Sequence, residues 1–229
     1  MHANHTFVLI HARWHGAWCW DRVAARLRHA GHQVHTPDRL GFDRLLELVE
    51  TQDRPVVLAG HSSSGMTVSA LAELAPHRVG LLAYVSAFLL PNGMTPPEIS
   101  RADPRSILAE HVVLDERTGT MTVSAPEKVL FNACDPADAA FAASKLVPEP
   151  APPPDLPGVE LTEAGFGRIP RVYVECLADR ALSPIAQRRM YTLLPCRKVY
   201  RLPADHAPFL STPGPLADAL AEAATEFAT

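Results

Sequence analysis

The chain alternates between short, continuous apolar runs and segments whose apolar residues recur every three to four positions. The first pattern is typical of strands buried on both faces, and the second of amphipathic helices. Their alternation predicts parallel strands joined by right-handed helical crossovers in a doubly wound sheet. We expect strands at 6–10, 33–36, from 56, at 79–85, 171–176 and 198–202, and helices at 17–30, 44–50, up to 75, 184–194 and 213–227.

The alternation breaks down in the middle of the chain. Weaker patterns there predict a helix at 104–110, a small strand at 121–123 and proline-opened helices at 126–133 and 136–146. A proline-rich stretch with polyproline character follows at 148–157. The domain organisation that we expect is an α/β core, formed by residues 1–87 and 166–229, and a cap insertion at 88–165. The proline-rich stretch would be the semi-rigid return segment of the cap.

Composition excludes several classes of partner. Hydrophobic residues make up 47% of the 229 positions and charged residues 20%, with a net charge of -4. The charges are scattered, so there is no basic face for nucleic acid and no polybasic patch for a membrane surface. No apolar run approaches the length of a membrane span. The first residues lack the charged and apolar regions of a signal peptide, and we therefore expect a cytoplasmic protein.

The four cysteines do not form a motif. Cys19, Cys134, Cys176 and Cys196 are far apart, without a C-x-x-C pair or a histidine at metal-binding spacing. They are predicted to be reduced and mostly buried thiols. The sequence gives no reason to expect a metal or another cofactor, predicts a small molecule as partner, and leaves a homodimer open.

The strand that begins at residue 56 runs into the sequence Gly60-His61-Ser62-Ser63-Ser64-Gly65, and a helical pattern follows. Strand, tight turn and helix are the context of a nucleophile elbow, G-x-S-x-G, in which small residues let strand and helix approach. Ser64 replaces the second glycine, with Gly65 directly behind it. An ordinary serine/glycine turn that caps a helix is the alternative. The pattern favours the elbow, with Ser62 as nucleophile.

Two further residues complete a candidate triad. Ser62, Asp179 and His206 each follow the carboxyl end of a predicted parallel strand, where open α/β sheets bind ligands. A serine hydroxyl needs a neighbouring imidazole to take its proton, and the imidazole needs a carboxylate to fix its tautomer. Asp205 is the alternative acid, but it is adjacent to His206 in the sequence. The oxyanion would be held by the backbone N–H groups of Arg13, after the first strand, and of Ser63.

The same stretches resemble one known family. Residues 7–11 and 15–20, Gly60-His61-Ser62, and the segments at 86–88, 179–182 and 204–211 are similar to motifs of plant methylesterases, such as salicylate-methylester hydrolases, and of plant hydroxynitrile lyases with their bacterial relatives. The resemblance spans the chain except part of the cap. It implies the α/β-hydrolase fold, the triad Ser62, Asp179 and His206, and the oxyanion hole at Arg13 and Ser63.

The resemblance also indicates the residues near a substrate pocket: Ala12, Trp14, Phe88 and Ala207. Packing is the favoured role for Trp14 and Trp18. The lyases of the family carry lysine and threonine where this chain has Ala207 and Ala12, so the cation that would hold a leaving cyanide is missing. The Arg13 side chain, where relatives have alanine, would lie either at the surface beside Asp38 or across the pocket mouth.

Three functions are therefore weighed. The leading hypothesis is a serine carboxylesterase that hydrolyses small, largely apolar esters through an acyl-enzyme. The alternative is a lyase, of the hydroxynitrile-lyase type or a cyclase, that uses the same triad for acid–base chemistry. A non-catalytic small-molecule binder is third, because an intact triad argues against it.

Overall fold

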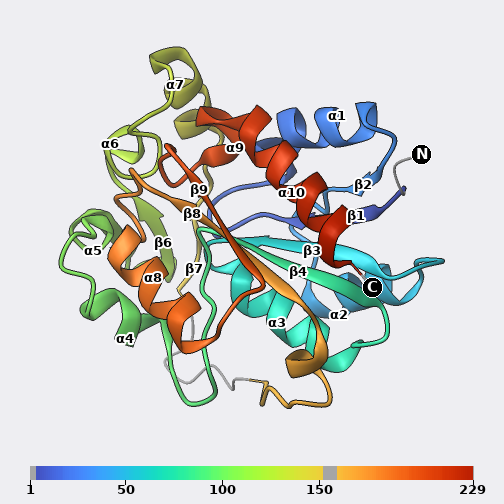
Figure 1. Ribbon diagram of the computed structural model, residues 1–229. Helices are drawn as coiled ribbons and strands as arrows, with labels where there is room; N and C mark the ends of the chain where they lie inside the picture. The colour runs from blue at the N-terminus through green and yellow to red at the C-terminus, as the bar shows by residue number, and fades with distance from the viewer. Residues whose placement is uncertain (1–3, 152–158, 229) are drawn as a thin grey trace.

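Six parallel strands form the centre of the protein (Figure 1). The computed structural model describes residues 4–151 and 159–228. The strand order is β2-β1-β3-β4-β8-β9, so the chain leaves β1 toward one edge and returns to its other side at β3. The strands are β1 (Thr6–Ile10), β2 (Gln33–His35), β3 (Val56–His61), β4 (Val79–Val85), β8 (Arg171–Cys176) and β9 (Lys198–Leu202). The predicted fold class, a parallel doubly wound sheet flanked by helices, is confirmed.

Helices cover both faces of this sheet (Figure 1). In β1, Phe7 and Leu9 belong to the apolar cluster of one face, and Val8 and Ile10 to that of the other. The first face is covered by α1 (Asp21–His29), α9 (Pro208–Ser211) and α10 (Pro213–Phe227), and the second by α2 (Phe42–Glu50), α3 (Ser64–Leu74) and α8 (Pro184–Leu193). Because both of their faces are buried, the inner strands β1, β3 and β4 are largely continuous apolar runs rather than alternating ones.

The segment expected to form a cap carries its own small antiparallel sheet, in the order β5-β6-β7. Its elements are α4 (Pro96–Arg101), α5 (Leu108–His111), β5 (Val112–Asp115), β6 (Thr120–Val123), α6 (Pro126–Val129), α7 (Pro136–Lys145) and β7 (Glu149–Pro150). The strand predicted at 121–123 is therefore present, and it pairs with two strands that the sequence patterns do not reveal. The division of the chain into core and cap stays a prediction.

The helix predicted at 104–110 is wrong over its first half. Residues 104–107 are irregular, and they are fixed by contacts with the loop after β8. The Ile107 N–H donates to the Arg180 carbonyl, and the Ser106 hydroxyl donates to the Ala181 carbonyl. The bond from Ile107 uses a backbone N–H that a local helix would otherwise pair. Only α5, one turn long, remains of it.

Other boundaries shift as well. The helix predicted at 17–30 opens as a 3₁₀ turn, η1 (Ala17–Trp20), and the helix predicted from 44 begins at Phe42. The helix predicted at 126–133 ends at Val129, and a second 3₁₀ turn, η2 (Phe166–Arg168), precedes β8. Of the proline-rich stretch, Glu149 and Pro150 form β7, which pairs with β6. Residues 152–158, where the polyproline segment was expected, lie outside the described residues.

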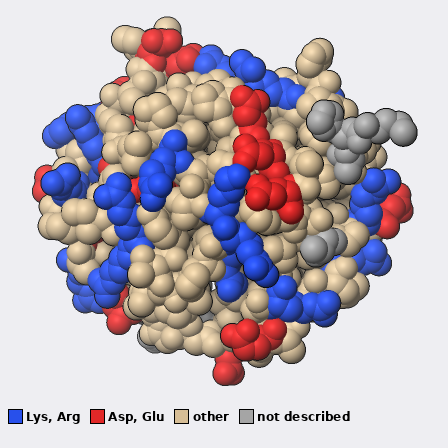
Figure 2. Space-filling model, viewed as in Figure 1, with Lys and Arg blue, Asp and Glu red and all other residues tan. Residues whose placement is uncertain are grey.

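The surface and the cysteines agree with the sequence. Basic and acidic side chains are interspersed on the face in Figure 2. All four cysteines are free, and Cys19 and Cys176 are buried. Within residues 4–151 and 159–228, no helix combines the length and apolarity that crossing a bilayer requires. The same residues contain no group of three or more potential metal ligands. Location in the cytoplasm and assembly as a homodimer stay predictions.

Candidate active site

The turn after β3 has the strained geometry expected of a nucleophile elbow. Ser62 has a φ of 52°, in the left-handed region that residues with a side chain rarely adopt. Gly60 lies close to the first turn of α3, and a Cβ there would stand 2.9 Å from the Ser64 carbonyl oxygen. A Cβ on Gly65 would collide with the backbone of Phe88. Small residues are thus required on both sides of Ser62, as the motif predicts.

Ser64 occupies the position of the second glycine without a clash, and its hydroxyl is used there. The hydroxyl lies 2.9 Å from the Ile10 carbonyl oxygen and 2.8 Å from the His61 carbonyl oxygen, to which it can donate. It therefore ties the start of α3 to the ends of β1 and β3. This contact explains why serine is accepted at a position where glycine is usual.

Asp179 and His206 are hydrogen-bonded to each other. The His206 Nδ1–H donates to Asp179 Oδ2 over 2.7 Å, and both side chains are almost completely buried. The other carboxylate oxygen, Oδ1, accepts the backbone N–H groups of Ala181 (2.7 Å) and Leu182 (2.9 Å). Because Nδ1 carries the proton, Nε2 is left as the basic nitrogen of His206.

Two residues that hold this carboxylate were not identified from the sequence. The Ser86 hydroxyl donates to Asp179 Oδ2, and the Gln187 amide lies 3.4 Å from the same oxygen. Ser86, directly after β4, has a φ of 41°. Its place at the end of a strand next to β8 is the signal that could have revealed it. Gln187 lies inside α8, where nothing in the sequence marks a polar residue as buried.

His61, at the end of β3, connects this strand to the histidine loop, the segment 203–207 between β9 and α9 that carries His206. Its Nε2–H donates to the His206 carbonyl oxygen over 2.7 Å, and the two imidazole rings are 4.7 Å apart. His61 is fully buried, and burial holds its pKa well below the usual 6.5. Burial also lowers the pKa of the neighbouring His15 to about 3. Both rings are therefore neutral at physiological pH, and His61 fixes the backbone beside Ser62 relative to that of His206.

Asp205, the alternative acid, has different partners. Its carboxylate accepts the N–H groups of Ala133 (2.7 Å) and Ala207 (3.0 Å) and the hydroxyl of Ser211 (2.9 Å). Ala133 lies between α6 and α7, so Asp205 joins the histidine loop to the expected cap. The carboxylate that binds the His206 ring is that of Asp179.

The loop after β1 is held by the expected cap. Trp14 has a φ of 67°, and its N–H donates to the Glu149 carboxylate over 2.9 Å. The Val147 N–H donates back to the Trp14 carbonyl, and an Arg13 guanidinium N–H donates to the Pro150 carbonyl over 2.8 Å. The Arg13 backbone N–H, expected in the oxyanion hole, donates to the Ser63 hydroxyl over 3.0 Å.

The contact with Pro150 bears on the two directions considered for the Arg13 side chain, which were outward beside Asp38 or across the pocket mouth. The guanidinium binds β7, and Asp38 instead accepts the Ala17 N–H over 2.8 Å. A pairing of Arg13 with Asp38 is therefore wrong.

The residues expected near a pocket differ in exposure. Ala12, Trp14 and Ala207 are buried, and Phe88 is half-buried. The Trp14 indole N–H donates to the Met121 carbonyl of β6, which supports a packing role. The Phe88 N–H donates to the Ser62 carbonyl over 3.0 Å, so the backbone of Phe88 supports the elbow. Trp18 stacks on His15.

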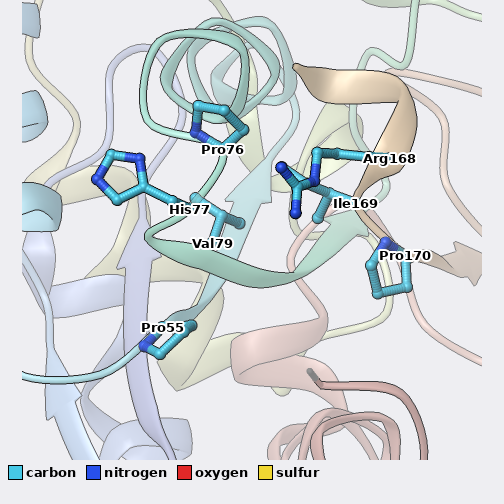
Figure 3. A pocket seen from close by; sticks show the side chains of 7 residues that line it. All are labelled: Pro55, Pro76, His77, Val79, Arg168, Ile169 and Pro170. Atoms are coloured by element: carbon cyan, nitrogen blue, oxygen red, sulfur yellow. The ribbon is translucent and has the colours of Figure 1, made fainter. Parts of the chain in front are cut away.

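A separate hollow lies at the opposite edge of the sheet (Figure 3). It has a volume of about 220 Å³ and is lined by Pro55, Pro76, His77, Val79, Arg168, Ile169 and Pro170. Pro55 and Pro170 immediately precede β3 and β8, so the hollow marks the amino ends of these strands. Ser62 and Asp179 follow the carboxyl ends of the same two strands, and the hollow is no part of their site.

Comparison with known proteins agrees with the fold. The chain matches the alpha/beta hydrolase family over residues 7–219 and belongs to it. It is 31% identical to a carbendazim hydrolyzing esterase of Nocardioides sp., with 94% of this chain and 98% of that protein aligned. It is 29% identical to methylesterase 7 of Arabidopsis thaliana, over 97% of each chain. The expected class, an esterase of the α/β-hydrolase family, is confirmed.

A solved structure supports the same fold. Tomato methylketone synthase I, in complex with 2-tridecanone, superimposes with a TM-score of 0.85 over 98% of this chain and 99% of that chain. At 21% sequence identity, this likeness concerns the fold alone.

Proposed function

We propose that this chain is a serine carboxylesterase that hydrolyses small, largely apolar esters with Ser62, His206 and Asp179 as its triad. The observation that carries the proposal is the 2.7 Å bond between His206 Nδ1 and an Asp179 carboxylate held by backbone N–H groups. This bond leaves a basic Nε2 on a histidine at the edge of the sheet where Ser62 sits in its left-handed turn. The esterases among the relatives support the same class of reaction.

In the proposed first half-reaction, the Ser62 hydroxyl attacks the ester carbonyl while His206 Nε2 accepts its proton. The carbonyl π electrons move to oxygen, and the oxyanion hole formed at Arg13 and Ser63 stabilises the charge. Asp179 stabilises the imidazolium without accepting its proton. Collapse of the tetrahedral intermediate breaks the bond to the alkoxide, which leaves as an alcohol with the proton from His206.

In the second half-reaction, His206 deprotonates a water molecule that attacks the acyl-Ser62 carbonyl. The same oxyanion hole is used again, and the carboxylic acid leaves with Ser62 regenerated. Every proton moves between Ser62, His206, water and the leaving group, so the cycle is balanced without a further reactant.

The preference for apolar esters rests on residues next in the chain to the proposed oxyanion hole and base. Ala12 and Ala207, which flank the proposed oxyanion hole and base, are small, apolar and buried. The Ala207 N–H is bound by Asp205, and no cation stands at this position to hold a leaving anion such as cyanide. This argues for ester hydrolysis over the lyase alternative.

The test is the hydrolysis of p-nitrophenyl acetate and of a panel of methyl esters by wild type and by the variant Ser62→Ala. We expect kcat to fall by at least about 10³-fold, because an alanine cannot form the acyl-enzyme. Ser100→Ala, at an exposed serine of α4, is the matched control and should retain the wild-type rate. Circular dichroism spectra of the three proteins should coincide.

Two outcomes would contradict the proposal. Turnover by Ser62→Ala at the wild-type rate would remove Ser62 as nucleophile. Turnover of an ester that never acylates Ser62 in rapid-quench mass spectrometry would mean that His206 activates water directly, as an acid–base catalyst without a covalent intermediate.

A further inference from the structure

The oxyanion hole contains a side chain that the proposed mechanism does not yet use. The Ser63 hydroxyl accepts the Arg13 backbone N–H over 3.0 Å. A donor of an oxyanion hole is expected to stand 2.7–3.1 Å from the oxyanion, roughly the separation seen here. The Ser63 Oγ therefore occupies the place in front of the Arg13 N–H where the substrate oxygen would otherwise bind.

The Ser63 hydroxyl also retains a donor of its own. A hydroxyl has one O–H and two lone pairs, and the Arg13 N–H takes up one lone pair. Among the hydrogen bonds of residues 4–151 and 159–228, the Ser63 O–H has no acceptor. Ser63 is half-buried, unlike Ser64, which is buried with its hydroxyl turned toward the ends of β1 and β3.

We propose that the Ser63 hydroxyl is itself an oxyanion donor. It accepts a hydrogen bond from the Arg13 N–H and donates a hydrogen bond to the substrate oxygen. The oxyanion would then be held by two donors from one residue, the backbone N–H and the side-chain O–H of Ser63. The Arg13 N–H acts behind the hydroxyl and polarises it. No proton is transferred in this chain, because each group keeps its hydrogen throughout the reaction.

Two features of the surrounding structure favour this relay over displacement of the hydroxyl. The Arg13 loop is fixed by contacts of Trp14 with Glu149 and Val147 and of Arg13 with Pro150. Ser63 stands at the start of α3, directly after the constrained turn at Ser62. With both backbones held, the hydroxyl proton can turn toward the substrate without breaking the existing bond.

The two hydrogen bonds, from Arg13 to Ser63 and from Ser63 to the substrate oxygen, should also strengthen as negative charge develops on that oxygen. Hydrogen bonds in a chain polarise one another, and a bond to an ionised acceptor is stronger than one to a neutral carbonyl. The Ser63 O–H therefore stabilises the tetrahedral intermediate more than the bound ester. Its loss should lower kcat rather than raise KM.

The experiment compares Ser63→Ala, Ser63→Thr and wild type on the best ester found for the enzyme. All three proteins keep the backbone N–H groups of residues 13 and 63. We expect Ser63→Ala to lower kcat about 10- to 100-fold with little change in KM, and Ser63→Thr, which restores a hydroxyl, to recover most of the loss. Ser100→Ala should again match wild type. If Ser63 had only a structural role, Ser63→Ala would instead lower the urea concentration at the midpoint of unfolding. We expect this midpoint to be unchanged.

The inference rests on the proposed function, and a second measurement separates the two. Paraoxon phosphorylates a reactive serine with release of p-nitrophenolate, and its phosphoryl oxygen uses the same hole. Ser62→Ala should abolish the release, whereas Ser63→Ala should only slow it, by a factor similar to the loss in kcat. Peptide mass spectrometry should place the label on Ser62.

Two outcomes would overturn the inference. If Ser63→Ala keeps or exceeds the wild-type kcat and labelling rate, the Arg13 N–H binds the oxyanion directly and the hydroxyl only blocks it. If wild type neither hydrolyses esters nor reacts with paraoxon, the proposed function fails and this inference fails with it. The label on wild-type Ser62 distinguishes the two cases.

Discussion

Asp179 and Asp205 occupy similar places in the fold but serve different partners. Each follows the carboxyl end of a strand, β8 or β9, and these strands are neighbours in the sheet. Their relative exposures are 4% and 0%. Asp179 binds backbone N–H groups through one oxygen and the ring of His206 through the other. Asp205 binds the backbone of Ala133 and Ala207 and the hydroxyl of Ser211.

This difference shows that burial and location do not by themselves assign a role to a carboxylate. A charge taken out of water requires several donors wherever it stands, and both residues have them. The two carboxylates differ in the groups that they contact beyond the neighbouring backbone N–H groups. Asp179 faces the imidazole that the proposed mechanism uses as its base. Asp205 faces backbone N–H groups, a hydroxyl and the thiol of Cys134, whose pKa is raised by burial and by Asp205 itself, so that this thiol keeps its proton. We therefore propose that Asp179 orients the base and that Asp205 anchors residues between α6 and α7.

The largest effect is expected at Asp179. In Asp179→Asn the amide oxygen can still accept the N–H groups of Ala181 and Leu182, but the amide nitrogen would face His206 Nδ1. A donor there favours the tautomer with the proton on Nε2, which cannot accept a proton from Ser62. We expect kcat for p-nitrophenyl acetate to fall about 10³- to 10⁴-fold, as in other triads, with the circular dichroism spectrum unchanged.

Asp43→Asn, at an exposed position of α2, is the charge-matched control for this measurement. It should leave kcat unchanged. If Asp179→Asn stayed within tenfold of wild type while Asp205→Asn lost most activity, the two roles would be exchanged.

At Asp205 the effect should appear in stability. Asp205→Asn replaces hydrogen bonds to a charged acceptor by weaker ones to an amide, and its two amide hydrogens would face donors. We expect the free energy of unfolding to fall by about 2 kcal/mol in urea titrations, with kcat within a few-fold of wild type. Asp135→Asn, exposed at the start of α7, is the control and should leave the unfolding midpoint unchanged. An unfolding midpoint that is the same for Asp205→Asn and wild type would remove its anchoring role.

The core could be predicted from the sequence because its signals are local. The strands predicted at 79–85, 171–176 and 198–202 have the same bounds in the structure. The position of the elbow follows from small residues around Ser62. The bond between Asp179 and His206 follows from strand ends that meet at one edge of a parallel sheet.

The contacts with the expected cap could not be predicted in the same way. Ser106 and Ile107 are held by carbonyls of residues 181 and 180, and Arg13 by the carbonyl of Pro150. Backbone carbonyls are present at every position, so no residue type marks the ones that will accept a distant donor. The bond between the Arg13 N–H and the Ser63 hydroxyl is missed for a related reason, since it depends on a side-chain rotamer.

The histidines extend the comparison of the two carboxylates. His206 has a carboxylate on Nδ1, whereas Nδ1 of His15 faces the Arg13 carbonyl oxygen over 2.8 Å. Nε2 of His15 is buried and has no hydrogen-bond partner among the described residues. Burial lowers the pKa of His15 from 6.5 to about 3. His15 is thus a buried histidine without the carboxylate that would stabilise its charged form.

The lowered pKa makes stability depend on pH, with a definite sign. Below pH 6.5 the unfolded chain binds a proton at residue 15 and the folded protein does not. Proton binding therefore stabilises the unfolded state relative to the folded state. The contribution of His15 to the free energy of unfolding is fully favourable above pH 6.5, and it decreases as the pH falls toward 3. At pH 5.5, one unit below the unfolded value, the loss from this residue is about 1.4 kcal/mol.

The variant His15→Asn isolates this contribution, which is the smallest of the three effects. Its side-chain N–H can still donate to the Arg13 carbonyl, but it does not titrate. The free energies of unfolding of wild type and variant are measured in urea at pH 8 and pH 5.5. On acidification wild type should lose about 1.4 kcal/mol more than the variant, because other titrating groups are common to both proteins and cancel. An equal loss in the two proteins would mean that folded His15 takes up a proton near pH 6, and that a buried histidine of this site is stable in its charged form without a carboxylate.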